Sequence, residues 1–419
     1  MKLNVAVVFG GKSTEHEVSV ISSLQAIENI DKEKYNVVAI YMDKQGDFYY
    51  SKENLLVDSK NFRNIRALLS KCNNVYFVKD KNHTYIREVN AGLFGNKISQ
   101  LIDVAFPVVH GTNVEDGNLQ GYFHTLNLPV VGPDTLSAAL SMDKYVMKEY
   151  CKAIGVPVID ALRFDRKDFN NIDAIIKKVK DEIGFPVIVK PINLGSSIGI
   201  KKAKNEESLK DSLELAFSFA DIILVEKAIT NLREINCAVL GDKFESECSA
   251  LEEPFGNDEI LSFADKYMGG GSGAKGSKVG AKSKVVGGDM LSSRAGSKNG
   301  TVGAKNGSVG AKSGMASLSR KVPADIDDKK ADEIRKYAKM IFKYLGCSGV
   351  SRIDFIIDKD TDKVYANEIN SIPGSLSYYL FKPLGMEYKT LLDRLINIAI
   401  ENYKNAERLN FSFESNLLA

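Results

Sequence analysis

The chain has 419 residues, of which 44% are hydrophobic and 26% are charged, values typical of a globular protein with a sizeable core. This length predicts two or three domains. The net charge of +2 argues against a protein that coats nucleic acid or an anionic membrane. No apolar run approaches the ~20 residues of a membrane-spanning helix, and the first residues lack the pattern of a signal peptide.

The cysteines indicate the redox environment. They are odd in number, widely spaced and free of any C-x-x-C pair, which argues against structural zinc and against a disulfide framework. A reducing, cytoplasmic location is therefore expected. The five residues are Cys72, Cys151, Cys237, Cys248 and Cys347.

The first third of the chain alternates short β-branched runs with helical patterns. Such alternation predicts a mostly parallel sheet covered by helices. A helix is expected to begin near Glu15, and a long one to cover 136–154 before Gly155 and Pro157 end it. The expected strands of this part are 5–9, 35–41, 104–109 and 129–131.

Two further α/β units follow. The first has a Gly/Ser loop at 193–199 between its strands. The expected strands are 186–190, 222–226, 236–240, 350–357 and 364–369. The expected helices are 206–219, 331–345 and 388–402. We therefore predict three units, at 1–135, 136–228 and 229–419.

Residues 268–321 break this pattern. The segment is rich in Gly, Ser, Lys and Ala, repeats V-G-A-K three times, and carries ten Lys/Arg against one acid, Asp289. Such a composition buries too little apolar area to offset its ordering entropy, so we expect a flexible insertion. It has no Phe, Tyr or Trp for base stacking, which disfavours a nucleic-acid-binding arm.

Two strands near the C-terminus carry the strongest chemical signal. Arg352 and Asp354 are two residues apart on one strand, and Glu368 and Asn370 are two apart on the next. Each pair therefore projects from one face of the sheet. Two carboxylates and an amide oxygen suit Mg²⁺, which commonly shares its ligands with substrate phosphates. The alternative is an exposed sheet face with incidental charges.

Several loops carry weaker signals. Lys190 ends a strand before Gly195, Ser196 and Ser197, whose backbone N–H groups can wrap phosphate oxygens. The lysine precedes the glycines, so this is not a Walker A loop, and a solvent-exposed turn is the alternative. G-G-K-S-T-E-H-E, ending at Glu17, follows the first strand and lacks the G-x-G-x-x-G of a dinucleotide fold.

The remaining loop signals each have a plain alternative. Glu15 can hold a substrate ammonium or only favour its helix dipole. His110, before E-D-G-N-L-Q-G, can be a ligand or a structural histidine. Glu226 and Lys227, at the end of a strand, can present backbone groups to an adenine, although E-K is common in such connections.

Taken together and in this order, the motifs resemble those of the D-alanine–D-alanine ligases of the ATP-grasp superfamily. The resemblance covers nearly the whole chain outside the insertion. It rests on G-G-K-S-T-E-H-E-V-S, H-G-…-E-D-G-N-L-Q-G, A-L-S-M-D-K, P-V-I-V-K-P-…-G-S-S-I-G, S-R-I-D-F and N-E-I-N-S-I-P-G. It implies a three-domain ATP-grasp fold with an N-terminal parallel-sheet domain, and ATP-dependent synthesis of D-alanyl-D-alanine for peptidoglycan precursors.

The resemblance also implies roles for single residues. Glu15 would hold the first substrate's ammonium and, with Ser196 and Tyr267, orient the substrate and anchor a lid. Arg352 and the N–H of Gly374 would stabilise the tetrahedral intermediate. The implied substrate contacts further include His110, Ser377 and Tyr379. The implied ATP contacts are Lys144, Lys190, Ser196, Ser197, Glu226, Lys227, Ile229, Glu234 and Lys266. The implied ligands of two Mg²⁺ ions, or of Mn²⁺, are Asp354, Glu368 and Asn370.

Three departures from the family pattern leave alternatives open. The loop after His110 reads T-N-V-E-D-G, the lid is enlarged, and Tyr379 stands where a serine commonly meets the second substrate's carboxylate. D-Ala–D-Ser or another dipeptide is therefore an alternative product, whereas Tyr267 disfavours D-Ala–D-lactate. A nucleotide-binding sensor on the same fold is disfavoured by the intact Asp354 and Glu368. The expected partners are small molecules and a second copy of the chain in a homodimer, with no nucleic acid and no membrane span.

Overall fold

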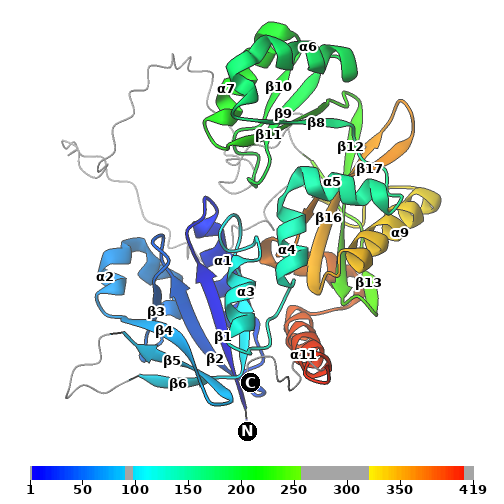
Figure 1. Ribbon diagram of the computed structural model, residues 1–419. Coiled ribbons are helices and arrows are strands. Elements are labelled where there is room, and N and C mark those ends of the chain that lie inside the picture. The colour runs from blue at the N-terminus through cyan, green and yellow to red at the C-terminus, as the bar shows by residue number, and fades with distance from the viewer. Residues whose placement is uncertain (1, 90–97, 256–319, 410–419) are drawn as a thin grey trace, which may run out of the picture.

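The computed structural model describes residues 2–89, 98–255 and 320–409. Figure 1 shows three sheets lying apart from one another, with the N-terminal sheet at the bottom, the central one at the top and the C-terminal one at the right. Among these residues no helix is long and apolar enough to cross a membrane.

The N-terminal sheet is mixed, with strand order β6-β5-β4-β3-β2-β1-β7. Only β1 (Leu3–Gly10), β2 (Tyr35–Met42) and β7 (Val104–Pro107) are parallel. The expectation of a mostly parallel sheet is wrong for the other four strands, which pair antiparallel with their neighbours; a short hairpin link, such as the one at 81–82, reverses the chain. These four strands are β3 (Phe48–Tyr50), β4 (Asn73–Asp80), β5 (His83–Glu88) and β6 (Ser99–Ile102).

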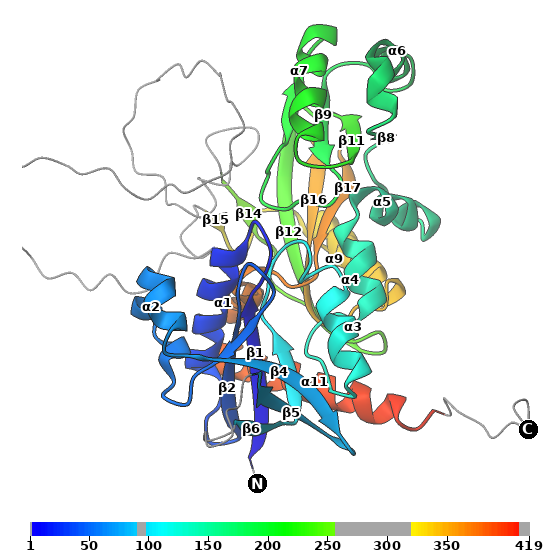
Figure 2. The ribbon, with the colours of Figure 1, turned by 60° about the vertical axis from the view of Figure 1, so that its left-hand side comes forward.

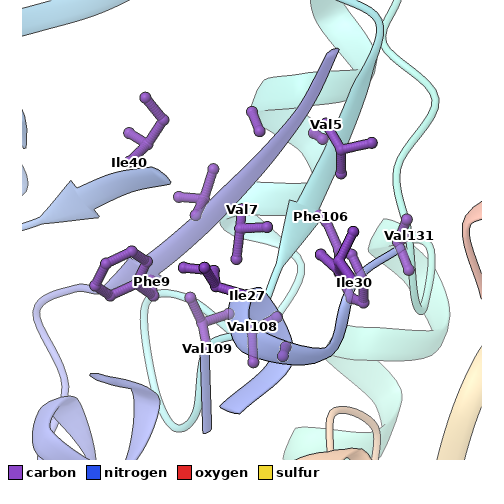
Figure 3. Packing of buried hydrophobic residues seen from close by; sticks show 14 of the residues in the cluster. Val5, Val7, Phe9, Ile27, Ile30, Ile40, Phe106, Val108, Val109 and Val131 are labelled. Atoms are coloured by element: carbon purple, nitrogen blue, oxygen red, sulfur yellow. The ribbon is translucent and has the colours of Figure 1, made fainter. Parts of the chain in front are cut away.

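Helix α1 (His16–Asn29) packs on β1, whose residues from Val5 to Phe9 are fully buried. Figure 3 shows side chains of β1 together with Ile27, Phe106 and Val108 in this core. Gly10, with a φ of +92°, turns the chain from strand to helix, and a Cβ there would lie 2.3 Å from the Met42 carbonyl oxygen. The turn sets the start of α1 at the carboxyl end of β1.

The central sheet is antiparallel, in the order β10-β9-β11-β8. Its core is formed with the amphipathic helices α6 (Ile172–Glu182) and α7 (Glu206–Phe217). Figure 2 shows this unit above the other two. Its strands are β8 (Ala161–Asp165), β9 (Val187–Pro191), β10 (Lys201–Ala203) and β11 (Ile222–Lys227).

The C-terminal sheet has the order β13-β12-β16-β17, and all its pairings are antiparallel. It shares a core with α9 (Asp328–Tyr344) and with residues of α5 (Lys144–Ala153). The strands are β12 (Leu232–Gly241), β13 (Ser246–Cys248), β16 (Gly349–Asp358) and β17 (Lys363–Asn370). Helix α11 (Tyr388–Ala406) runs back to the N-terminal sheet and packs on β7.

The single helix expected over 136–154 is wrong. The structure has α4 (Thr135–Met142) and then α5, separated at Asp143. The Asp143 carboxylate accepts hydrogen bonds from the N–H groups of Tyr145 and Val146, so it caps a new helix. The turn places Lys144 at the first position of α5, where its side chain enters the site described below.

A small ladder lies beside the third sheet. β14 (Glu253–Pro254) pairs antiparallel with β15 (Arg320–Lys321), and these pairs flank 256–319. The expected insertion therefore lies outside the described residues, apart from its last two. The expected strand at 129–131 is reduced to one bridge between Ala105 and Val130. Shorter helices are α2 (Ile65–Leu69), α3 (Asn118–Thr125) and α10 (Tyr378–Phe381), with 3₁₀ turns at Leu55–Val57, Ser59–Asn64, Asp168–Asn171, Gly374–Ser377 and Lys382–Leu384.

Candidate active site

A polar cavity lies where loops of all three units meet. The N-terminal unit contributes Glu15, His110 and Glu115 to its lining, and the loop after β9 contributes Gly195 and Ser196. The remaining lining comes from the helices α4 and α5, the C-terminal strands and the loops that follow them. These residues are Ser141, Met142, Lys144, Glu234, Asn236, Glu252, Pro254, Arg352, Asp354, Glu368, Ile369, Asn370, Ile372 and Gly374.

Strand register brings the predicted carboxylates together. Asp354 lies opposite Glu368, and Arg352 lies opposite Asn370. The Arg352 guanidinium donates two hydrogen bonds to Asp354, from Nε to Oδ1 at 2.6 Å and from a terminal nitrogen to Oδ2 at 2.7 Å. Burial by itself would lower the pKa of Arg352, but the charge of Asp354 raises it well above its ordinary value. Arg352 is therefore charged, and the two hydrogen bonds hold both side chains in place.

This strand pair fits a divalent cation that is shared with a substrate. The described residues contain no cluster of three or more His, Cys, Asp or Glu that could hold a metal by themselves. The donors here are two carboxylates and the amide of Asn370, whose Nδ2 donates to Asp354 Oδ2 at 3.0 Å. Magnesium is commonly held by one or two carboxylates and completed by phosphate oxygens and water. The donor set fits that arrangement.

A second cavity adjoins the first and shares Gly195, Glu234 and Glu368 with it. Isoleucines contribute its apolar walls, two of them from the strands β9 and β16 and the others from loops, and such walls suit a flat aromatic ring. Of the predicted ATP contacts, Lys190, Ser197, Glu226, Lys227, Ile229 and Glu234 all line this second cavity. The second cavity is therefore suited to a nucleotide, and it lies next to the carboxylate pair of the first cavity.

Glu226 is buried between two lysines. Lys190 forms an ion pair with one carboxylate oxygen, and Lys148 Nζ lies 3.1 Å from the other. Burial by itself would raise the pKa of Glu226, but the two lysine charges lower it to about 2. Glu226 is therefore an anion that neutralises this part of the site. Lys148 belongs to none of the sequence motifs and was not predicted, although its spacing of four from Lys144 puts both on one face of α5.

Lys144 is buried, and its Nζ donates to the Leu194 carbonyl oxygen at 2.7 Å. Burial lowers the pKa of Lys144, and the nearby Lys190 lowers it further. Glu368, Glu15 and Glu226 oppose this by their charge. Lys144 is held at the edge of the loop after β9, near the carboxylates, where its ammonium can bind a polyanion.

The loop after β9 closes on the N-terminal unit. Ser196 Oγ donates a hydrogen bond to Glu15 Oε1 across a sequence separation of 181 residues. Ser196 and Ser197 both have a positive φ, 53° and 60°, which turns the loop sharply. A Cβ on Gly195 would lie 2.6 Å from Glu15 Oε2, so only glycine allows this approach. Two of the three members predicted for this cluster are thus in contact, whereas Tyr267 lies outside the described residues, as does Lys266.

His110 connects the N-terminal unit to the loop after β17. Its Nδ1–H donates to the Ile372 carbonyl oxygen at 2.8 Å, so its Nε2 accepts from the Ser22 hydroxyl at 2.9 Å. Ser22 Oγ in turn accepts from the N–H of Ser375 at 3.2 Å. Burial lowers the pKa of His110 to about 4. The imidazole is therefore neutral near pH 7, and both of its nitrogens are engaged within the protein.

Glu115 forms a second connection to the same loop, and the sequence analysis assigned it no role. Its carboxylate accepts from the N–H groups of Gly111, at 3.0 Å, and Ile372, at 2.9 Å, and from the Ser371 hydroxyl at 3.2 Å. Burial raises the pKa of Glu115 to about 7. The only sequence signal was its place in the E-D-G motif after His110.

The raised pKa of Glu115 predicts a pH-dependent stability. The Glu115 carboxyl binds its proton more tightly in the folded protein than in the unfolded chain, where its pKa is 4.5. The resulting contribution to the free energy of unfolding is fully present below pH 4.5 and is lost as the pH rises through 7. The loss amounts to at most about 3 kcal/mol. We therefore expect Glu115→Gln to gain stability relative to the unsubstituted protein between pH 5 and pH 8, measured as the difference in unfolding temperature. An equal difference at both pH values would contradict this prediction.

The residue predicted to stabilise the tetrahedral intermediate, Gly374, and two predicted substrate contacts, Ser377 and Tyr379, lie in different places. Gly374 lines the first cavity, whereas Ser377 and Tyr379 do not appear in its lining. Tyr379 instead lines a neighbouring surface hollow with Arg320. Its hydroxyl donates to Glu252 Oε2 at 3.2 Å, and Glu252 does line the cavity. Tyr379 is thus connected to the cavity through Glu252.

Comparison with known proteins agrees with this geometry. The family model of the D-ala D-ala ligase N-terminus matches residues 4–133, and that of the D-ala D-ala ligase C-terminus matches 150–285 and 311–397. The chain belongs to the D-alanine–D-alanine ligase family. The six sequence motifs that indicated this family fall within the matched regions or, for A-L-S-M-D-K, between them.

Named ligases match along their whole length. The D-alanine–D-alanine ligase of Thermosipho melanesiensis is 34% identical over 418 residues, covering 99% of this chain and 98% of the relative. That of Staphylococcus epidermidis is 31% identical over 418 residues, with 99% of each covered. The resemblance stated from the sequence is confirmed.

Solved structures of the family share the fold. The D-alanine–D-alanine ligase from Coxiella burnetii superposes with a TM-score of 0.74 at 25% identity, covering 97% of this chain and 96% of the other. The VanG D-Ala:D-Ser ligase from Enterococcus faecalis gives 0.70 at 28% identity, covering 95% and 100%. The predicted ATP-grasp architecture is thereby confirmed, with a mixed rather than a parallel N-terminal sheet.

Proposed function

We propose that this protein joins two D-alanine molecules into D-alanyl-D-alanine at the expense of ATP, which becomes ADP and phosphate. The proposal rests on the first cavity, which is lined by Asp354, Glu368 and Arg352 together with Glu15. The second cavity, which is suited to a nucleotide, adjoins it. Full-length similarity to named D-alanine–D-alanine ligases supports the same activity. The dipeptide would serve as a precursor for peptidoglycan.

The reaction has two steps. The carboxylate of the first D-alanine attacks the γ-phosphorus of ATP, and the bond from that phosphorus to ADP breaks. The amine of the second D-alanine then attacks the acyl carbon, inorganic phosphate leaves with the electron pair of the C–O bond, and the nitrogen releases its surplus protons to solvent. Phosphoryl transfer mainly asks a protein for positioning and charge neutralisation.

In this proposal, the chain's own residues do that positioning. Glu15, held by Ser196, binds the ammonium of the first D-alanine, and Lys144 and Lys190 bind the phosphates. Lys227, Ile229 and Glu234 contact adenine and ribose. Asp354, Glu368 and Asn370 would hold magnesium, two ions by family resemblance, and bound magnesium would neutralise phosphate charge.

Arg352 and the Gly374 N–H would stabilise the oxyanion of the tetrahedral intermediate, as fixed donors aimed at developing charge do. Arg352 supports this role because it is only 7% exposed and donates two hydrogen bonds to Asp354. Its guanidinium is therefore already in position and does not have to move during the reaction. Glu115 and His110 would position the loop that carries Gly374.

The test is incubation with ATP, Mg²⁺ and D-alanine, with D-alanine, D-serine, D-lactate or glycine offered as second substrate and products read by mass spectrometry. We expect D-alanyl-D-alanine as the main product and ADP release that requires D-alanine. A D-Ala–D-Ser product is the alternative, since a relative of that specificity shares the fold. Absence of D-alanine-dependent ADP would contradict the ligase proposal.

Two substitutions should separate the substrates. Lys190→Ala is expected to raise the KM for ATP, since it removes a phosphate contact, whereas Glu15→Gln should mainly raise the KM for the first D-alanine. Each effect should be about tenfold or more, the usual worth of a hydrogen bond to a charged group. Steady-state kinetics with each substrate varied in turn would check both. Equal changes in both KM values for both variants would contradict the assignment.

Three further proposals concern the setting of the enzyme. The protein would form a homodimer, which light scattering after gel filtration would test. A cytoplasmic location is supported by five cysteines that are all free thiols. The division into 1–135, 136–228 and 229–419 stays a prediction, and limited proteolysis would test it.

A further inference from the structure

Asn236 has a buried oxygen that no group in the described part of the chain satisfies. The residue lies on β12, opposite Asp354, and is 4% exposed. Its Nδ2 donates to Glu252 Oε2 at 3.2 Å, but among the described residues its Oδ1 has no hydrogen-bond partner. Because an unsatisfied buried acceptor is costly, and because Asn236 lines the cavity, this oxygen is a site for a donor from a ligand.

Glu252 adds a negative charge beside that oxygen. It is 2% exposed and lines the same cavity. Three side chains hold its carboxylate from behind: Arg320 donates to Oε1 at 2.6 Å, and Tyr379 and Asn236 donate to Oε2, each at 3.2 Å. The Arg320 guanidinium also lies over the Tyr379 ring, 4.3 Å from its centroid. The carboxylate therefore has a fixed orientation.

We propose that Asn236 Oδ1 and the Glu252 carboxylate bind the amino group of the second D-alanine. This inference rests on the proposed ligase function and adds two residues to it. An amino group is a cationic donor without acceptor capacity when protonated, so it matches an unsatisfied oxygen next to a fixed carboxylate. Tyr379 and Arg320 are positioning residues, because they act through Glu252.

The place of the pair favours the second amino acid over the first. The ammonium of the first amino acid has its own carboxylate at Glu15, which belongs to the N-terminal unit and accepts a hydrogen bond from Ser196. Asn236 and Glu252 belong instead to the C-terminal unit and share the cavity with Arg352 and Gly374, the proposed oxyanion donors. The bound ammonium would first lose one proton to solvent, and the resulting amine would lie beside the acyl carbon that it attacks, with the departure of phosphate as written above.

Hydroxylamine gives a readout that separates the two substrates. It is small and uncharged at neutral pH, so it can attack the acyl phosphate without an amine-binding site, releasing phosphate and D-alanyl hydroxamate. With Asn236→Leu, which conserves volume, we expect dipeptide formation at subsaturating D-alanine to fall by about tenfold to a hundredfold. Hydroxamate formation from D-alanine, ATP and hydroxylamine should be unchanged. Glu252→Gln should show the same split.

Three outcomes would overturn the inference. Dipeptide and hydroxamate could fall together, which would place Asn236 with the metal, ATP or the first substrate. Both could stay unchanged, or the loss could be matched by Gln120→Met. Gln120 is the control because its Oε1 is also buried and has no hydrogen-bond partner within residues 2–89, 98–255 and 320–409, but it lies on α3 outside the cavity lining. Unfolding temperatures check that each variant folds, and a wild-type protein that makes neither product would instead contradict the ligase function.

Discussion

Replacing Glu226 by leucine should lower the free energy of unfolding by about 3–5 kcal/mol, the usual cost of removing one partner from a buried ion pair. The side chains of Glu226, Lys148 and Lys190 are 1%, 2% and 10% exposed. Without the carboxylate, two buried ammonium groups would face each other with no counter-ion. Urea denaturation followed by circular dichroism would measure the change.

A second substitution tests the cause. Adding Lys148→Met to Glu226→Leu removes one of the two stranded charges, so the double variant should be more stable than the single one. The surface pair Lys177–Asp181, whose side chains are 78% and 52% exposed, is the control. Asp181→Asn should change the free energy of unfolding by less than about 1 kcal/mol. A single variant as stable as the unsubstituted protein would contradict the prediction.

Glu368→Gln should reduce D-alanine-dependent ADP formation by about 100- to 1,000-fold, as the loss of a group that stabilises transition-state charge does elsewhere. The substitution keeps the shape of the side chain but removes one of the two carboxylates that lie opposite each other in the β16–β17 register. The Mg²⁺ concentration for half-maximal rate should also rise. Coupled ADP assays across a Mg²⁺ titration would measure both effects.

The matched control lies in the same hairpin. Asp362, in the turn between β16 and β17, pairs with Lys330 and has a side chain that is 81% exposed. Asp362→Asn should leave the ADP rate and the Mg²⁺ dependence unchanged. If Glu368→Gln kept full activity, the two strands would not form the metal site proposed for them.

The sequence predicted the strands that are buried on both faces better than the others. Continuous apolar runs such as the one from Val5 to Phe9 are visible without tertiary information. The strands β3 to β6 were missed, because β3 and β6 are very short, β4 and β5 mix polar with apolar residues, and the pairing of all four depends on their neighbours. The break at Asp143 was missed because the apolar period continues across it and only the capping side chain marks the boundary.

For the site, the sequence identified groups that belong to motifs and missed those that act through tertiary contacts. Asp354 and Glu368 were found from alternation on two strands, which fixes their common face. Lys148, Asn236 and Glu252 belong to no motif, and their importance comes from burial and from partners on other strands or helices. Such partners become visible only once the strand register is known.

The β14–β15 ladder has a consequence for how this gene product can change. Because Pro254 lies opposite Arg320, the chain leaves the third unit and returns to it at one point. The entropy of closing a loop grows only with the logarithm of its length, so extra residues between these two points add little to the free energy of closing the link. A change in the number of V-G-A-K repeats should therefore be tolerated there, provided that Lys266 and Tyr267, which precede the repeats, are kept.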